Sequence, residues 1–222
     1  MLKNKRALIT GSNGGIGSEI SKVLFENGSN LVLLYNKNRD KIDKLISDNH
    51  DNKSRIETYQ VDLTDSIALE KVLKKITESE RVDIFIHSVS LPISHKSIMA
   101  LGWNDYQSHI DLQTKSFIQI IQSLIPSMKE NKGKIINILT AYVVGAPPNH
   151  ISNYIMSKYS LLGLSKALAV ELGQYGITVN CVSPSITETP LTANLPSKIK
   201  EIAKAQTPIK QLTTPKAIAN VV

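Results

Sequence analysis

The sequence predicts an α/β protein, a doubly wound parallel β-sheet in a single domain over residues 1–222. Short aliphatic runs alternate with longer amphipathic ones, and that alternation implies right-handed crossovers between parallel strands. The short runs are apolar at successive positions, as strands covered by helices on both faces must be. No internal repeat, low-complexity tract or linker marks a second domain, and the length suits one.

The elements can be assigned in order along the chain. Strands are predicted at residues 7–10, 31–35, 55–61, 82–87, 134–139 and 178–183. Segments with helical periodicity lie at residues 16–27, 39–47, 66–77, 103–128 and 152–175. Gly28 and Gly176 stand where two of these helices end, and Pro126 lies near the end of the long one.

The C-terminal end is irregular. After Pro184 the chain runs into two short polar helical patterns, of which the last begins at Pro215. That last pattern stops at Val222 after about two turns, which is short for a helix of a packed domain. We therefore expect the C-terminal end to be incomplete, with further sequence beyond Val222.

Composition and charge exclude several classes of protein. With 41% hydrophobic and 20% charged residues, the chain is neither collagen-like nor disordered. No apolar run reaches the roughly 18 residues of a bilayer span or forms a signal peptide, so we predict a cytoplasmic protein without a membrane partner. Cys181 is the single cysteine, and no metal site is predicted. The net charge of +7 comes from scattered lysines, so we predict no nucleic-acid partner.

A glycine-rich turn follows the first predicted strand, where residues 10–17 read Thr-Gly-Ser-Asn-Gly-Gly-Ile-Gly. Gly11 permits a tight turn, Gly15 and Gly17 let backbone amides approach a pyrophosphate, and the next helix points its positive N-terminus there. A turn that merely packs tightly is the alternative, but its place between strand and helix favours nucleotide binding. The predicted cofactor contacts at this turn are Gly11, Ser12, Asn13, Gly15, Ile16 and Gly17.

The end of the second strand selects between NAD and NADP. An acid there would hold the ribose hydroxyls of NAD and repel a 2′-phosphate, and the segment Tyr-Asn-Lys-Asn-Arg has none. Asn36 and Lys37 offer donors suited to a phosphate, so NADP (NADPH) is predicted over NAD. Arg39 fits a solvated charge at the next helix equally well. Asp62, with Leu63, is predicted to meet the adenine, or alternatively to cap the following helix.

Tyr154 and Lys158 form the candidate catalytic pair. They stand at i and i+4 of a predicted helix, which brings the ammonium close to the phenol. A phenol with a pKa near 10 is a poor acid or base at neutral pH, and a neighbouring cation lowers that pKa by favouring phenolate. A Tyr-x-x-x-Lys pattern is common by itself, but here it follows a nucleotide turn in the same chain.

On these motifs the chain resembles the short-chain dehydrogenase/reductase family, and within it the 3-oxoacyl-acyl-carrier-protein reductases. The similarity spans nearly all of residues 3–222 and includes residues 103–105, 133–138, 165–172 and 175–180. The resemblance implies a Rossmann-like fold and an oxidoreductase that moves a hydride between nicotinamide and a small-molecule carbonyl or secondary alcohol. A 3-oxoacyl thioester is a candidate substrate, and the family's assembly implies a homotetramer or homodimer.

The resemblance also assigns roles to residues. It makes Tyr154 the general acid/base, and it has Lys158 bind the nicotinamide ribose while lowering the pKa of Tyr154. Thr140 aligns with the family's substrate-orienting serine. Further cofactor contacts fall in the loops after the fourth and sixth strands, at Ser88, Pro184, Thr187 and Thr189.

Four departures from the family pattern bear on these roles. Thr140 adds a methyl group beside the substrate. It precedes the catalytic tyrosine by 14 positions, one more than is common, so Tyr142 is the alternative donor. Asp111 lies closest to the asparagine that supports a proton-relay water, and is a candidate catalytic residue or a solvated or capping acid. His87 begins the segment that replaces Asn-Ala-Gly, and we interpret it as a satisfied strand-end histidine.

Two other functions stay open on the sequence alone. A sugar or secondary-alcohol dehydrogenase of the same family is one, because the loops that would shape the pocket carry no substrate signature. A non-catalytic nucleotide-binding sensor or scaffold is the other, because of the departures above. Consumption of NADPH with a panel of carbonyl compounds separates the enzyme from the sensor.

Overall fold

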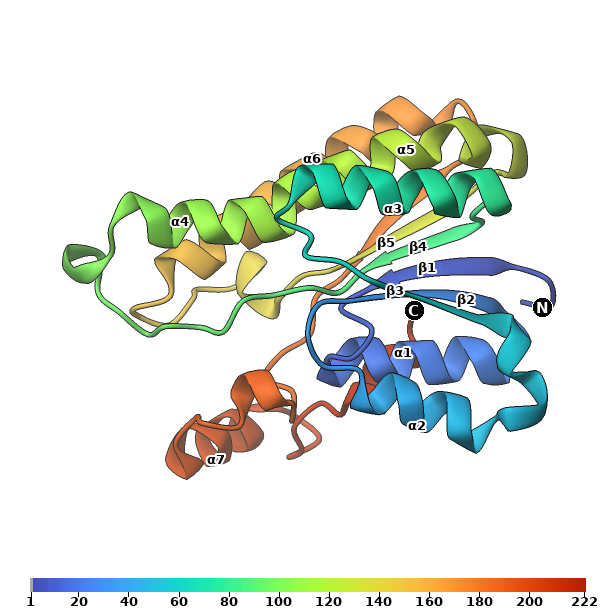
Figure 1. Ribbon diagram of the computed structural model, residues 1–222. Coiled ribbons are helices and arrows are strands. Elements are labelled where there is room, and N and C mark those ends of the chain that lie inside the picture. The colour runs from blue at the N-terminus through green and yellow to red at the C-terminus, as the bar shows by residue number, and fades with distance from the viewer. Residues whose placement is uncertain (1) are drawn as a thin grey trace.

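The computed structural model describes residues 2–222 and has the predicted architecture, a six-stranded sheet between layers of helices (Figure 1). All neighbouring strands are parallel, in the order β3-β2-β1-β4-β5-β6. The strands are β1 (Arg6–Thr10), β2 (Asn30–Tyr35), β3 (Ile56–Gln60), β4 (Ile84–His87), β5 (Lys134–Ile138) and β6 (Thr178–Val182). The order reverses between β1 and β4, and the carboxyl ends of strands at such a point form the ligand crevice of open α/β sheets.

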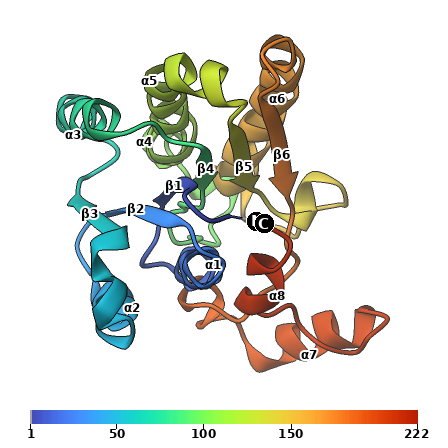
Figure 2. The ribbon, with the colours of Figure 1, turned by 90° about the vertical axis from the view of Figure 1, so that its right-hand side faces the viewer.

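Helices cover both faces of the sheet (Figure 2). One face carries α1 (Gly15–Glu26), α2 (Asp40–Asp48) and α8 (Pro215–Ala219). The other carries α3 (Ser66–Ser79), α4 (Trp103–Ile110), α5 (Ser116–Asn131) and α6 (Ser152–Gly173). Helix α7 (Ser197–Gln206) lies below the carboxyl edge of the sheet in Figure 1. Within residues 2–222, no helix has the length and apolar composition needed to cross a membrane.

The two faces of the sheet hold separate apolar cores. Successive side chains of a strand point to opposite faces, so Leu8 packs into the core under α3, α5 and α6 while Ile9 packs into the core over α1. In the first core Phe85 stacks on Phe117 with ring centroids 5.8 Å apart. Both cores are fully buried, which makes the sheet a rigid support for the loops at its carboxyl edge.

The long helix predicted at residues 103–128 is interrupted. Helices α4 and α5 are joined by a π-helical turn, Asp111–Lys115, and α5 continues past Pro126 to Asn131. A π-turn places an extra residue in the helix, so the apolar pattern before and after it shifts phase without any Gly or Pro to signal the change. Such turns are frequent at functional sites, and this one packs against helix α6.

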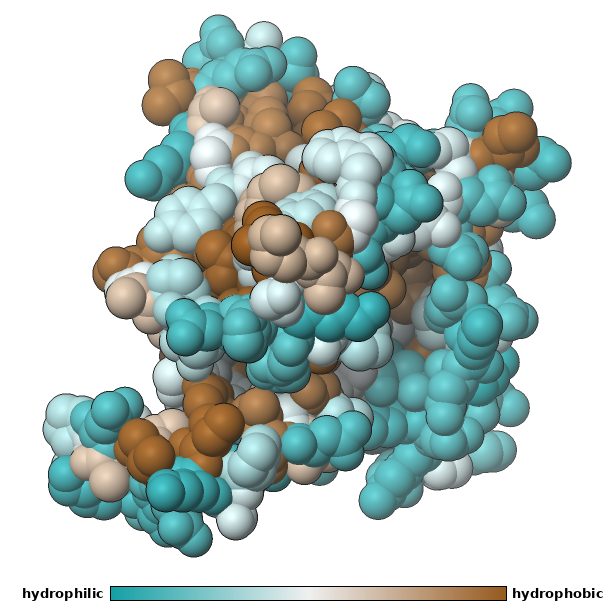
Figure 3. All heavy atoms as spheres, turned by 90° about the vertical axis from the view of Figure 1, so that its left-hand side faces the viewer, coloured by the Kyte–Doolittle hydropathy of each residue, from teal (hydrophilic) through white to brown (hydrophobic). Residues whose placement is uncertain are grey.

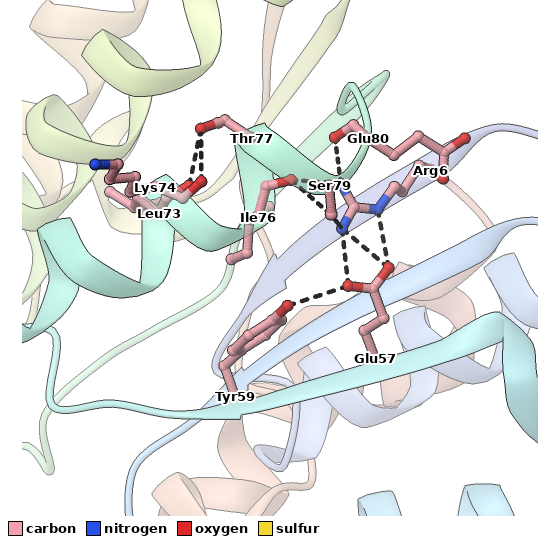
Figure 4. A network of polar contacts seen from close by, with 9 residues as sticks. All are labelled: Arg6, Glu57, Tyr59, Leu73, Lys74, Ile76, Thr77, Ser79 and Glu80. Carbon is pink, nitrogen blue, oxygen red and sulfur yellow. Dashed lines mark hydrogen bonds and ion pairs between the residues drawn. The ribbon is translucent and has the colours of Figure 1, made fainter.

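A buried arginine joins strands and helix at the opposite, amino edge of the sheet (Figure 4). Arg6 is 1% exposed, and its guanidinium donates to both carboxylate oxygens of Glu57 at 2.9 Å and to Ile76 O at 2.9 Å. Tyr59 Oη also donates to Glu57, at 3.2 Å. Because a buried charge is tolerated only when it is paired, this cluster fixes β1, β3 and α3 to one another, away from the carboxyl edge.

Candidate active site

The glycine turn after β1 forms an open anion site at the start of α1. Gly11 has φ +66°, and a side chain there would place Cβ 2.5 Å from Ser88 O, so the loops after β1 and β4 touch. Gly14 N donates to Gly11 O at 2.8 Å and closes the turn. No side chain caps α1, which leaves the backbone N–H groups of its first turn free. Free N–H groups at a helix N-terminus bind phosphate.

Gly15 and Gly17 allow close packing around this turn. A Cβ on Gly17 would lie 2.2 Å from Gly11 O, so Gly17 lets the helix pack against the turn itself. Gly17 thus has a packing role, and its predicted approach to a pyrophosphate stays a prediction. A Cβ on Gly15 would lie 2.7 Å from the side chain of Thr189. The first and last of the predicted cofactor segments are therefore side by side.

The other side chains of the turn hold it in place. Ser12 Oγ donates to Leu34 O at 2.9 Å, which ties the turn to β2. Asn13 Oδ1 accepts from Lys41 N at 2.9 Å, and so ties it to α2. Ile16 packs against the core beneath α1. These contacts position the backbone of the turn for a ligand.

Asn36 and Lys37 follow β2, Asp62 follows the neighbouring strand β3, and the three lie close together at the carboxyl edge of the sheet. Asn36 Nδ2 donates to Asp62 Oδ2 at 3.4 Å. Hydrogen bonds from Thr64, then from Asn36, and the charge of Lys37 lower the pKa of Asp62 below its usual value. The alternative role of Asp62 as a helix cap is wrong, because the carboxylate that accepts from the first N–H groups of α3 is that of Asp65.

Arg39 is engaged elsewhere. Its Nε donates to Asp43 Oδ1 at 2.8 Å, one turn along α2, and its guanidinium lies 5.5 Å from the centre of the Tyr35 ring. Asn36 and Lys37 are thus the donors best placed to meet a ribose phosphate. The sequence left Arg39 between a phosphate partner and a solvated charge, and its pairing with Asp43 favours the second.

Tyr154, Lys158 and Thr140 come together at the carboxyl edge, all of them buried. Helix α6 presents the first two, and Thr140 follows β5 directly. The hydroxyl of Thr140 lies close enough to the phenol of Tyr154 to lower its pKa. Lys158 Nζ donates to Ile138 O at 2.9 Å and lies 5.8 Å from the centre of the Tyr154 ring. An ammonium has three N–H groups, so two remain for a ligand.

Burial controls the protonation of this pair. It raises the pKa of Tyr154 above its ordinary value near 10, and the nearby Thr140 hydroxyl offsets this only in part. Burial also lowers the pKa of Lys158 to about 7. The expectation that Lys158 lowers the pKa of Tyr154 is therefore wrong for the protein without a ligand. Desolvation disfavours both charged forms, and at neutral pH the phenol keeps its proton.

Tyr142 also lies beside Tyr154. It is half-buried, its phenol is close enough to raise the pKa of Tyr154, and its backbone N–H donates to Thr140 Oγ1 at 3.5 Å. Both candidate orienting hydroxyls therefore reach the same site. The two act in opposite directions, since Thr140 lowers the pKa of Tyr154 and Tyr142 raises it.

The remaining predicted cofactor residues lie in loops at the same edge or in the core beside it. Ser88 N donates to Thr10 Oγ1 at 3.2 Å, and Pro184 O accepts from Ala141 N at 2.8 Å. Thr187 is buried, with Oγ1 donating to Ser185 O, and Leu63 packs in the core beneath α3. Their contacts with a cofactor stay predictions.

Asp111 opens the π-turn, where Oδ1 accepts from Gln107 Nε2 at 2.9 Å, one turn back on α4. A catalytic role for it stays a prediction. The interpretation of His87 is confirmed, since Nδ1 lies 3.0 Å from Thr10 Oγ1 and Nε2 lies 2.8 Å from Gln113 O. Burial lowers the pKa of His87 to about 3.

Sequence reasoning missed two buried polar residues, His109 and Gln113. Gln113 Nε2 lies 3.2 Å from His109 Nδ1 and donates to Ser157 Oγ at 2.8 Å. The available signal was a polar pair at i and i+4 on the face of a helix that otherwise buries apolar side chains. This pattern was overlooked because the π-turn shifts the buried face of the helix.

These donors fit a dinucleotide. The uncapped start of α1 suits a pyrophosphate, Asn36 and Lys37 suit a ribose phosphate, and the buried ammonium of Lys158 suits a ribose hydroxyl beside Tyr154. A phenol, a hydroxyl and an ammonium converging beside a nucleotide crevice define an oxidoreductase site, in which the cofactor carries the redox chemistry and the protein supplies position and electrostatics.

Comparison with known proteins identifies the class. Residues 11–222 match a family model described as "Enoyl-(Acyl carrier protein) reductase". The chain belongs to this family of short-chain dehydrogenases/reductases, and the protein is an oxidoreductase. The resemblance to short-chain dehydrogenases/reductases that the sequence predicted is thereby confirmed.

Particular relatives narrow the comparison. The chain is 31% identical to a 3-oxoacyl-[acyl-carrier-protein] reductase of Rickettsia bellii, covering 100% of this chain and 88% of the relative. It is 26% identical to the enzyme of the same name from Thermotoga maritima, covering 100% and 89%. A short-chain dehydrogenase from Burkholderia cenocepacia J2315, solved in complex with NADP, has a TM-score of 0.89 at 25% identity, covering 99% of this chain and 89% of that one.

Proposed function

We propose that the protein uses NADPH to reduce the ketone of a 3-oxoacyl thioester to a secondary alcohol. The observation that carries the proposal is the buried phenol of Tyr154, with the Thr140 hydroxyl beside it and the Lys158 ammonium on the same helix face. The relatives named 3-oxoacyl-[acyl-carrier-protein] reductase support the substrate, and the solved complex with NADP supports the cofactor.

The residues act as follows. When bound, the reduced nicotinamide supplies the hydride. Tyr154 holds the proton at Oη that the substrate oxygen needs as negative charge develops, and its raised pKa keeps that proton in place at neutral pH. Thr140 Oγ1 donates a second hydrogen bond to the same oxygen. Lys158 is fixed by Ile138 O and directs its free N–H groups to ribose and phenol. Because the phenol of Tyr154 is protonated at neutral pH, it can give a proton to the substrate oxygen, which favours the direction of reduction.

The surface around the site supports an acyl substrate. Figure 3 views the carboxyl edge and shows apolar side chains gathered at its centre and over the α7 segment at lower left. Exposed apolar residues on the segments of this edge are Met99, Val144, Ile199 and Ile202. An apolar chain could be covered by such side chains, whereas a sugar would find few polar partners among them.

A panel of substrates tests the proposal. NADPH consumption is measured with 3-oxoacyl thioesters of increasing chain length, simple ketones, quinones and sugars. We expect the thioesters to be reduced and KM to fall as the chain lengthens. If sugars or simple ketones are reduced and the thioesters are not, the alternative function of a sugar or secondary-alcohol dehydrogenase is favoured. Binding of NADPH with no reduction of any compound would favour the sensor.

The cofactor preference has its own test. NADPH is expected to bind at least about tenfold more tightly than NADH, or roughly 1.4 kcal/mol, because Asn36 and Lys37 replace the acid that would repel a 2′-phosphate. Lys37→Ala should weaken NADPH and leave NADH nearly unchanged, whereas Lys44→Ala, an exposed lysine on α2, should change neither. Equal affinities for both cofactors in a titration at fixed salt would contradict the preference.

Thr140→Val tests the orienting hydroxyl. Valine keeps the branched shape and removes the hydroxyl that would donate to the substrate oxygen, so turnover is expected to fall by about 10- to 100-fold with NADPH affinity kept. Steady-state kinetics and a cofactor titration measure the two effects. If Thr140→Val is fully active and Tyr142→Phe is not, the orienting role belongs to Tyr142.

Two further expectations remain predictions. The family resemblance implies a homotetramer or homodimer, and the composition of the chain implies a cytoplasmic protein. Neither affects the chemistry assigned to Tyr154.

A further inference from the structure

The π-turn between α4 and α5 places Gln113 among the buried residues that pack behind the candidate site. Gln113 is 0% exposed and lies behind the catalytic helix α6. Its backbone carbonyl accepts from His87 at the end of β4, at 2.8 Å, and its side-chain amide reaches His109 on α4 and Ser157 on α6. Ser157 lies between Tyr154 and Lys158 in the sequence. One residue therefore connects the nucleotide edge, helix α4 and the catalytic helix.

The chemistry of these groups fixes the direction of each hydrogen bond. Ser157 Oγ donates its proton to Tyr154 O at 2.8 Å, so it can only accept from Gln113, and the group facing it must be the amide nitrogen. The same nitrogen then donates to His109 Nδ1, which must carry no proton. A backbone carbonyl can only accept, so His87 Nε2 carries the proton there. His109 is therefore a neutral Nε2–H tautomer, and His87 is one as well because burial lowers its pKa to about 3.

The two hydrogen bonds of the Gln113 amide nitrogen leave the amide oxygen unpaired among the described residues. Gln113 Oε1 is buried and has no hydrogen-bond partner within residues 2–222. An unpaired buried acceptor is uncommon in folded proteins. The two donor bonds thus hold the amide in an orientation that its oxygen does not favour, and they fix it to His109 and Ser157.

We propose that Gln113 is a positioning residue for catalysis, which holds His109 unprotonated behind the site and holds Ser157 so that Tyr154 and Lys158 keep their places on α6. The kinetic part of this inference rests on the proposed function. The protonation state of His109 is independent of it.

The charge of His109 matters because of what surrounds it. On α6 it faces Lys158 and the ring of Tyr154, with ring centroids 6.3 Å apart, and on its own helix it faces Asp105. Burial, and then the charge of Lys158, lower the pKa of His109, whereas Asp105 raises it. A second cation here would disfavour the ammonium form of Lys158. The N–H of Gln113 reinforces the neutral state, since a donor cannot face a protonated nitrogen.

Nitrogen-detected NMR of the histidine side chains tests the first part on the parent protein. The chain has five histidines, and His87 and His109 are assigned by single His→Gln variants. We expect both to show Nε2–H tautomers and to have pKa values below the ordinary histidine value, because both rings are buried. A protonated Nδ1 on His109, or its titration near 6.5, would overturn the inference. This measurement needs no activity and no variant of Gln113.

Gln113→Glu tests the second part, with Gln122→Glu as the matched control, because Gln122 is exposed on α5. A carboxylate at 113 accepts from His109 and cannot donate to Ser157. We expect His109 to become protonated at Nδ1, kcat to fall at least about tenfold, the pH profile of kcat to gain an ionisation near neutral pH, and NADPH affinity to stay within about twofold. The control should match the parent in all four.

The outcomes separate the two claims. If Gln113→Glu keeps the parent's kcat and pH profile while His109 changes its protonation, Gln113 is not a positioning residue. If the parent reduces no carbonyl compound, the proposed function fails, and the tautomers of His109 and His87 still decide whether the network is as described. Gln113→Met, which is similar in length and lacks both donors, replaces Gln113→Glu if that variant does not fold. It should show the loss of kcat without the new ionisation, and a kcat equal to the parent's would overturn the positioning role.

Discussion

Replacing Tyr154 with phenylalanine is expected to reduce the rate of carbonyl reduction by about 10²- to 10⁴-fold, the range typical of a lost proton donor. Phenylalanine keeps the buried ring and removes only the hydroxyl that Thr140 contacts. The fold and the affinity for NADPH are expected to persist, because the glycine turn and the residues at the end of β2 are untouched. The loss therefore belongs to the chemical step.

Steady-state kinetics and a cofactor titration measure the two quantities on the same preparation. Tyr159→Phe is the control, since that phenol lies on the same helix and is 46% exposed. It should behave as the parent. A Tyr154→Phe variant as active as the parent would show that another group donates the proton.

Lys158→Met is expected to have opposite effects on activity and stability. Turnover and NADPH affinity should both fall, because the ammonium serves ribose and phenol together. The protein without cofactor should become more stable, by about 1 kcal/mol or more, since methionine fills the space without burying a charge. For a chain of this size that corresponds to a rise in Tm of roughly 2–4 °C.

The pH dependence of this stability difference follows from linkage. The pKa of Lys158 is about 7 in the folded state and 10.5 as its ordinary value, so between these the unfolded chain binds more protons. The free energy of unfolding of the parent therefore rises with pH across that window. The amount by which Lys158→Met is more stable than the parent should become smaller. Thermal unfolding at pH 7 and pH 10 measures it, with exposed Lys166→Met as the control. A stability difference between the two proteins that does not change with pH would contradict a buried charge on Lys158. So would a Lys158→Met variant that is no more stable than the parent.

The sequence allowed the fold to be predicted closely, because strands buried on both faces leave uninterrupted aliphatic runs. All six predicted strands begin and end within two residues of those observed, and the third is trimmed by one residue at each end. The glycine turn was predictable for a related reason. Gly11 and Gly17 stand where backbone conflicts allow no side chain, and such positions leave a mark in the sequence.

What the sequence did not reveal depends on tertiary packing. The π-turn leaves no residue signal, so the polar pair His109 and Gln113 was overlooked. The pKa of Tyr154 was expected to fall because spacing along a helix gives the distance to Lys158 but not the burial of both groups. Desolvation, which opposes the charge of each, is a property of the folded core.

The central claim is that a buried phenol donates the proton in an NADPH-dependent reduction. The most direct test is the stoichiometry of the reaction of the parent protein with a 3-oxoacyl thioester, from NADPH absorbance and chemical analysis of the product. The account predicts one 3-hydroxyacyl product for each NADPH oxidised, and less than about a hundredth of that rate with Tyr154→Phe. Tight binding of NADPH without formation of any hydroxyl product from the carbonyl panel would contradict it.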